Sequence, residues 1–214
     1  MAVRLILASA SPRRAELLRA AGIEFHAIAP GIDESGVAGE SPEHYARRVA
    51  EAKARAVFAR GEHDAVLAAD TVVVVDGAPL GKPANEADAA RMLRLLSGRE
   101  HVVMTAVCLM TRPGPAEAGH YDTRTPGVPG FSGPPRQRLQ TTLAQTSVWF
   151  AALSDTEIAW YVGTGEPWDK AGAYAVQGLA SRFVTRIDGS HSNVIGLPIA
   201  VVYDLCKQAG LLIC

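Results

Sequence analysis

The first residues of the chain restrict its fold class most, because they predict a strand, a turn and a helix in immediate succession. Residues 3–8 form a short apolar run, and three small residues follow at 9–11. Pro12 then suits the first position of a helix, where its missing N–H would be unpaired in any case. Ser11 is the predicted N-cap of that helix.

The start of this helix predicts a binding site for an anion. A helix N-terminus has unpaired N–H groups and the positive end of the macrodipole, and Arg13 and Arg14 add two positive charges there. Cations in this position oppose the dipole, so they favour a bound anion, most simply a phosphate. The plainer alternative is an ordinary helix start with two solvated arginines.

Segments of strand length alternate with helices along the rest of the chain. The dipeptide Asp76-Gly77 predicts a hairpin between two of these strands. The predicted strands cover residues 3–8, 23–28, 65–69, 72–75, 101–110, 141–150 and 183–187. Helices are predicted over residues 12–21, 41–60, 85–97, 154–161 and 198–210. This alternation, with hairpins among the strands, predicts an α/β fold with a mixed sheet.

Length and composition predict one domain over residues 1–214, with a sizeable core. Hydrophobic residues make up 48% of the 214 residues and charged residues 20%, which argues against global disorder. The net charge of -1 gives no field for binding a polyanion, so we expect no nucleic-acid polymer as partner.

Three widely spaced cysteines without a C-x-x-C pair favour a reducing compartment. The N-terminal apolar run is about four residues long, whereas a signal peptide needs roughly 7 to 15. No stretch approaches the ~20 apolar residues of a membrane span. We therefore expect a cytoplasmic protein without a membrane partner.

Residues 112–138 differ in composition from the rest of the chain. Six prolines and five glycines lie between Pro113 and Pro135, with almost no aliphatic residues. Such a segment cannot bury enough apolar surface to offset its ordering entropy, so we predict a disordered surface insertion. The flanking strands are expected to pair as a hairpin with a lengthened loop, because closure cost grows only logarithmically with length.

Asp70 directly follows the apolar run 65–69, which predicts a carboxylate at the end of a buried strand. Open α/β sheets bind their ligands at such strand ends. The alternative is an aspartate that only caps the following turn.

Other charged residues lie in predicted loops. Asp33 and Glu34 could supply oxygen ligands to Mg²⁺ or Mn²⁺, or could simply be solvated. Lys82 follows a glycine at a tight turn, but the spacing and the following proline exclude a Walker motif. With the predicted anion site and without a recognisable nucleophile, these groups fit metal-assisted attack of water on a phosphate ester or anhydride.

Four ordered motifs resemble the Maf family of nucleoside triphosphate pyrophosphatases, and the likeness extends from about Leu5 to Leu211, interrupted by the insertion. The motifs are Ser9-Ala10-Ser11-Pro12-Arg13-Arg14, Ala69-Asp70-Thr71, Gly81-Lys82-Pro83, and Asp169-Lys170-Ala171-Gly172-Ala173-Tyr174 with Gln177-Gly178. The resemblance implies a mixed twisted sheet with flanking helices and a central cleft, as in inosine-triphosphatase-like proteins. It also implies a homodimer.

The resemblance implies hydrolysis of a nucleoside triphosphate to the monophosphate and pyrophosphate with a divalent metal, Mg²⁺ or Mn²⁺. Asp70 would be the general base, Lys82 would contact the phosphates, and Glu34 and Asp70 would hold the metal. The implied substrate-binding residues are Ser9, Arg13, Arg14, Lys53, Thr71, Asp169, Lys170 and Gln177.

Within the family, Arg13, Thr71 and Gln177 resemble the branch that acts on dTTP and UTP. A glutamine amide can donate to a pyrimidine O4 and accept from N3–H, a pair of groups that cytosine reverses. Two other functions stay open. One is a pyrophosphatase for modified or purine nucleotides such as 7-methyl-GTP, and the other is a non-catalytic nucleotide-binding regulator of cell division.

Overall fold

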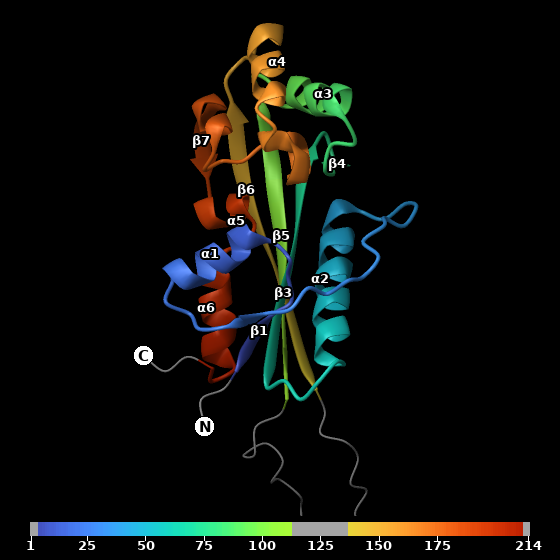
Figure 1. The fold of residues 1–214 in the computed structure, drawn as a ribbon, viewed down its shortest axis with the longest axis vertical. Helices are drawn as coiled ribbons and strands as arrows, with labels where there is room; N and C mark the ends of the chain where they lie inside the picture. Colours follow the sequence, from blue (N-terminus) through green and yellow to red (C-terminus); the bar gives the residue numbers. More distant parts are fainter. Residues whose placement is uncertain (1–3, 113–136, 212–214) are drawn as a thin grey trace, which may run out of the picture.

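A mixed sheet of seven strands forms the centre of the fold (Figure 1). The computed structural model describes residues 4–112 and 137–211. Its strands are β1 (Leu5–Leu7), β2 (His26–Ala27), β3 (Ala65–Val75), β4 (Ala78–Leu80), β5 (Glu100–Thr111), β6 (Arg138–Phe150) and β7 (Val184–Asp188). The α-helices are α1 (Pro12–Ala20), α2 (Pro42–Phe58), α3 (Glu86–Leu96), α4 (Asp155–Gly163), α5 (His191–Ile195) and α6 (Ile199–Gln208). Three short 3-10 helices are η1 (Glu166–Asp169), η2 (Ala171–Ala173) and η3 (Leu179–Phe183).

The sheet combines parallel and antiparallel pairing in the order β2-β1-β3-β5-β6-β7, with β4 paired to β3. β2, β1 and β3 are parallel, whereas β3, β5, β6 and β7 are antiparallel to their neighbours. The predicted α/β fold with a mixed sheet is therefore confirmed.

Alternating side chains of β3 build the cores on the two faces of the sheet. Val66 and Ala68 pack with apolar residues of α2, and Leu67 and Ala69 pack with α1 and α6. Figure 1 shows the same layers, with α2 on one side of the long strands and α1 and α6 on the other. This two-sided cover explains why β3 reads as a nearly continuous apolar run.

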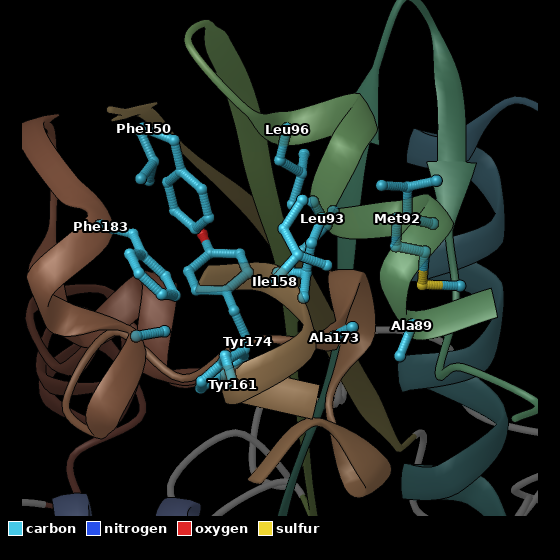
Figure 2. Close-up of a cluster of buried hydrophobic side chains, with 14 of the residues drawn as sticks. Ala89, Met92, Leu93, Leu96, Phe150, Ile158, Tyr161, Ala173, Tyr174 and Phe183 are labelled. Atoms are coloured by element: carbon cyan, nitrogen blue, oxygen red, sulfur yellow. The ribbon is translucent and has the colours of Figure 1, made fainter. Parts of the chain in front are cut away.

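A third core cluster joins α3 and α4 to the sheet (Figure 2). Leu93 and Ile158 meet there beside the aromatic rings of Phe150 and Tyr174. The Tyr174 hydroxyl also lies 2.8 Å from Nε2 of the buried His101. Tyr174 lies in the segment that begins at Asp169, so this core supports one of the four motifs.

Side-chain caps fix the starts of two predicted helices, and a hairpin turn forms where Asp76-Gly77 predicted it. Asn85 accepts from the backbone N–H of Asp88 at the start of α3, and Ser154 and Glu157 form the full capping box of α4. The turn at Asp76-Gly77 joins β3 to β4 with positive φ at both residues, as the hairpin prediction required.

The predicted hairpin around the insertion is also confirmed, because β5 and β6 pair as far as Thr111 and Arg138. Arg138, at the approximate end of the predicted insertion, is the first residue of β6. Residues 113–136 of the predicted insertion lie outside the described residues. None of the described helices is long and apolar enough to cross a membrane.

Candidate active site

A cleft of about 940 Å³ opens beside the middle of β3. One edge of β3 is paired with β5 along most of its length. The other edge is paired with β1 at residues 65–67 and with β4 at residues 73–75. Residues 68–72 lie between these two short neighbours, so the cleft lies where that edge of the strand lacks a described strand partner.

Asp70 lies in the middle of β3, and its prediction as a strand-terminal residue was wrong. Pairing with β5 continues through Asp70 and Ala106 and carries the strand on to Val75. A carboxylate is tolerated at this position because the neighbouring edge is open and a cation lies within reach. Asp70 is nevertheless only 6% exposed.

Lys53 joins two carboxylates at the floor of the cleft. Its Nζ lies 2.8 Å from Oδ1 of Asp70 and 2.8 Å from Oε2 of Glu34. The Lys53 side chain is only 6% exposed. Burial raises the pKa of Asp70, and the charge of Lys53 partly opposes that rise.

The loop that carries Glu34 is fixed to α2. The Tyr45 hydroxyl donates to the backbone oxygen of Glu34 over 2.8 Å. Arg48 binds Glu40 through two hydrogen bonds of 2.7 Å and donates to the backbone oxygen of Ser35. Asp33, the other carboxylate considered as a metal ligand, accepts from Ser35 in a local turn and does not line the cleft.

At the start of α1, Arg14 is turned inward and held by three oxygens. Its guanidinium donates to the backbone oxygen of Gly196 over 2.8 Å, to Thr71 Oγ1 over 3.1 Å and to Ser9 Oγ over 3.3 Å. Ser11 occupies the predicted N-cap position, but its side chain makes no cap hydrogen bond. Arg14 therefore orders this end of the cleft as well as adding charge to it.

Arg13 instead contacts the motif that begins at Asp169. Its Nη1 lies 2.7 Å from Oδ2 of Asp169, and Lys170 pairs with the other carboxylate oxygen. These pairs hold the pKa of Asp169 at about 2, although partial burial alone would raise it. The first and the last motif of the sequence thus meet across the cleft.

The cleft brings together all the site residues that the family resemblance implied, whereas Asp33 lies outside it. They are Ser9, Arg13, Arg14, Glu34, Lys53, Asp70, Thr71, Lys82, Asp169, Lys170 and Gln177. The side chains of Asp70 and Thr71 point to opposite faces of the sheet. Both line the cleft because this edge of β3 is open at residues 68–72. Their individual chemical roles stay predictions.

Sequence reasoning missed three residues that shape the cleft or its walls. Tyr45 packs against the core, and its hydroxyl anchors the Glu34 loop. Tyr174 lines the cleft from the core side. Glu166, the first residue of η1, was passed over. Each lies in a segment whose neighbours become known only from the tertiary fold.

Two carboxylates and several cations can bind a phosphate chain with a hard divalent cation. The carboxylates are those of Glu34 and Asp70. Within residues 4–112 and 137–211, no group of three or more His, Cys, Asp or Glu could hold a metal ion.

Comparison with known proteins places the whole fold in one family. The family described as "Maf-like protein" matches residues 4–209. A dTTP/UTP pyrophosphatase of Koribacter versatilis (strain Ellin345) is 49% identical over 208 residues, which are 97% of this chain and 95% of that protein. A dTTP/UTP pyrophosphatase of Anaeromyxobacter sp. (strain Fw109-5) is 47% identical over 210 residues, 98% of this chain and 91% of that protein. Among solved structures, the Staphylococcus aureus Ham1 protein matches with a TM-score of 0.48 at 15% identity, over 96% of this chain and 99% of that chain. The match to the family over residues 4–209 and the close relatives confirm the resemblance seen in the sequence, and the chain belongs to the Maf family.

Proposed function

We propose that this protein hydrolyses dTTP and UTP to the nucleoside monophosphate and pyrophosphate. The observation that carries the proposal is the buried Lys53 ammonium, which lies 2.8 Å from the carboxylates of both Asp70 and Glu34. This triad lies in a cleft large enough for a nucleotide. The relatives named dTTP/UTP pyrophosphatase are similar over nearly the whole chain, which supports the same pair of substrates.

In the proposed reaction, Asp70 takes a proton from a water molecule. The water oxygen forms a bond to the α-phosphorus as the bond from that phosphorus to the bridging oxygen of the leaving pyrophosphate breaks. A general base works best with a pKa near the working pH, and burial raises the pKa of Asp70 in that direction. Arg13 and Lys82, which line the same cleft, would stabilise charge on the departing pyrophosphate.

Glu34 and Asp70 fit a divalent cation such as Mg²⁺ or Mn²⁺. Their hard carboxylate oxygens converge on one buried ammonium, and Mg²⁺ is usually held by one or two carboxylates together with substrate phosphates. When bound, the cation would neutralise negative charge on the phosphate chain.

Gln177 supports the choice of thymine and uracil as bases. It lines the cleft and is exposed at its wall. Its amide can donate to O4 and accept from N3–H, so cytosine would leave both groups mispaired.

The test is pyrophosphate release from a panel of canonical and modified nucleoside triphosphates, with Mg²⁺ or with Mn²⁺. We expect release from dTTP and UTP. Asp70→Asn should lower kcat by about a hundredfold to ten-thousandfold, because loss of a general base removes about 10² to 10⁴ in rate, while nucleotide binding measured by calorimetry persists. Asp204→Asn, at an exposed position on α6 outside the cleft lining, is the matched control.

Other outcomes point to the two alternative functions. Release confined to 7-methyl-GTP or other purine nucleotides would identify a different branch of the family. Tight nucleotide binding by the folded protein, without release from any member of the panel, would favour a non-catalytic regulator of cell division.

The proposal also includes a homodimer in the cytoplasm. Light scattering of the purified protein would measure the oligomeric state, and fractionation of cells would measure the location. A monomer that retains full activity would remove the dimer from the proposal.

A further inference from the structure

Glu166 holds the segment that contains Gln177. Its Oε1 accepts from the hydroxyl of Tyr161 over 2.8 Å and from the backbone N–H of Ala180 over 3.3 Å. Its Oε2 accepts from the backbone N–H of Leu179 over 2.8 Å. One half-buried carboxylate thus binds a buried side chain and two backbone groups that follow Gln177 closely in the chain.

Gly178 lets this carboxylate approach the backbone. A Cβ at position 178 would lie 2.4 Å from Oε2 of Glu166, a distance that real Cβ atoms essentially never show. The φ angle of Gly178 is -103°, which any residue adopts, so the backbone conformation does not require glycine here. A larger residue here, directly next to Gln177, would displace the Glu166 carboxylate from its hydrogen bonds.

Glu166 is also tied to the opposite wall of the cleft. Lys170 Nζ donates to the backbone oxygen of Glu166 over 2.6 Å and contacts Asp169. Asp169 in turn binds Arg13 at the start of α1. Glu166 therefore connects Gln177 with cationic residues that line the other part of the same cleft.

We propose that Glu166 is a positioning residue that sets the base selectivity of the cleft by fixing the backbone on which Gln177 stands. The inference rests on the proposed function, since it concerns how the same site distinguishes thymine and uracil from cytosine. Glu166 acts through Gly178 and the first residues of η3, whereas Gln177 faces the base.

The main test is Glu166→Gln, which keeps the size of the side chain but replaces a pure acceptor with a group that also carries donors. An amide donor facing the N–H of Leu179 would displace the segment. We expect the ratio of kcat/KM for dTTP to kcat/KM for dCTP to fall about tenfold, mostly through a higher KM for dTTP. A hydrogen bond to a charged group has effects of this size. Glu62→Gln, exposed and outside the cleft lining, should leave the ratio unchanged.

A double-mutant cycle tests the close approach at Gly178. Gly178→Ala should lower the selectivity ratio in the wild-type background, because the new Cβ collides with the Glu166 carboxylate. In a Glu166→Ala background, Gly178→Ala should cause little further loss, because the colliding atoms are gone. Additive losses would contradict the proposed contact.

Tyr161→Phe provides a milder variant, since it removes one donor to Glu166 and leaves the cleft lining intact. It should lower the ratio in the same direction as Glu166→Gln. An unchanged dTTP-to-dCTP ratio in folded Glu166→Gln and Tyr161→Phe would overturn the inference. If Glu166→Gln does not fold, then Tyr161→Phe and the Gly178 variants decide.

Failure of the proposed function would give a different result from failure of the inference about Glu166. Wild-type protein that hydrolyses none of the triphosphates would defeat the proposed function while leaving the inference open to the same variants. Relative binding of dTTP and dCTP, measured by calorimetry, would then replace the kinetic ratio. A ratio of binding constants that Glu166→Gln leaves unchanged would overturn the inference there too.

Discussion

Burial favours the neutral form of two side chains that lie on neighbouring strands. For Asp70 on β3, burial raises the pKa and the charge of Lys53 partly lowers it again. For His101 on β5, burial lowers the pKa to about 4. His101 is 2% exposed and accordingly stays neutral at physiological pH.

The depressed pKa of His101 predicts a pH-dependent stability. Between pH 6.5 and about 4, a histidine of the unfolded chain is protonated while His101 in the folded chain is neutral. Unfolding therefore takes up a proton, and the contribution of His101 to stability, complete above pH 6.5, is lost as the pH falls toward 4. The loss is about 1.4 kcal/mol per pH unit, or roughly 3 kcal/mol over the range.

His101→Gln measures this contribution. The difference in the free energy of unfolding between pH 7 and pH 4.5, from chemical denaturation, should shrink by about 2 kcal/mol in the variant. The exposed His44 gives the matched control, and His44→Gln should leave the difference close to that of the wild type. Equal pH slopes for wild type and His101→Gln would show that this histidine titrates normally.

At the scale of elements, α2 serves both as a core helix and as the support of the Glu34 loop. One face of the helix packs on β3, and Lys53 on that face reaches the cleft. Tyr45 and Arg48 bind the loop through Glu34, Ser35 and Glu40. The position of Glu34, one predicted metal ligand, thus depends on Tyr45 and Arg48 as well as on its ion pair with Lys53.

Arg48→Lys tests this support. Lysine keeps the charge but cannot form the two-point contact with Glu40 or reach Ser35 in the same geometry. We expect kcat/KM for dTTP to fall about tenfold, equivalent to about 1.4 kcal/mol, with little change in melting temperature because partly exposed ion pairs add little to stability.

Arg47→Lys is the control on the same helix, because Arg47 pairs with Glu43 within α2 and donates to Thr141 rather than to the loop. It should keep wild-type kcat/KM. Equal activity of the Arg47 and Arg48 variants would mean that the Glu34 loop needs no such anchor.

Helix starts and tight turns were predictable because their signals are local. Ser154 with Glu157 and the Asp76-Gly77 dipeptide specify their structures within four residues. The uninterrupted course of β3 was not predictable in this way. Asp70 and Thr71 look like the end of a strand in the sequence, and only pairing with β5, distant in the chain, carries the strand past them.

Some residues of the site could be predicted from the sequence, whereas the contacts that hold them could not. The motifs singled out Asp70 and Lys82 because charged residues beside apolar runs or turns are conspicuous in a sequence. Nothing local indicates that the Glu166 carboxylate turns toward Leu179 and Ala180, or that the Tyr45 hydroxyl faces a loop. Such contacts depend on the arrangement of segments after folding, which local patterns do not encode.

At the scale of the whole molecule, the cleft lies away from the ends of β5 and β6 that the connection between them joins. β5 and β6 pair from Glu100 to Thr111, and Thr111 lies opposite Ala65 at the beginning of β3. The cleft opens further along β3. The cleft residues on β3 are therefore remote from the strand ends that this connection joins.

Replacing residues 113–136 with an Asn-Gly turn tests the single-domain prediction. We expect kcat/KM to stay within about twofold of wild type. The free energy of unfolding should rise by about 1–2 kcal/mol, because each halving of a loop lowers its closure cost by about 0.6 kcal/mol. Urea denaturation and the pyrophosphate-release assay measure the two quantities. Loss of folding would show that the insertion contributes to the core.

The long ladder between β3 and β5 has a consequence for sequence change. Successive side chains of β3 alternate between the α2 face and the α1 face, so Asp70 meets Lys53 while Thr71 meets Arg14. A slip of a single residue would exchange the two and offer a hydroxyl to the ammonium. An insertion or deletion of two residues in β3 before Asp70 would therefore leave Asp70 pointing toward Lys53. An insertion or deletion of one residue would turn it to the other face of the sheet.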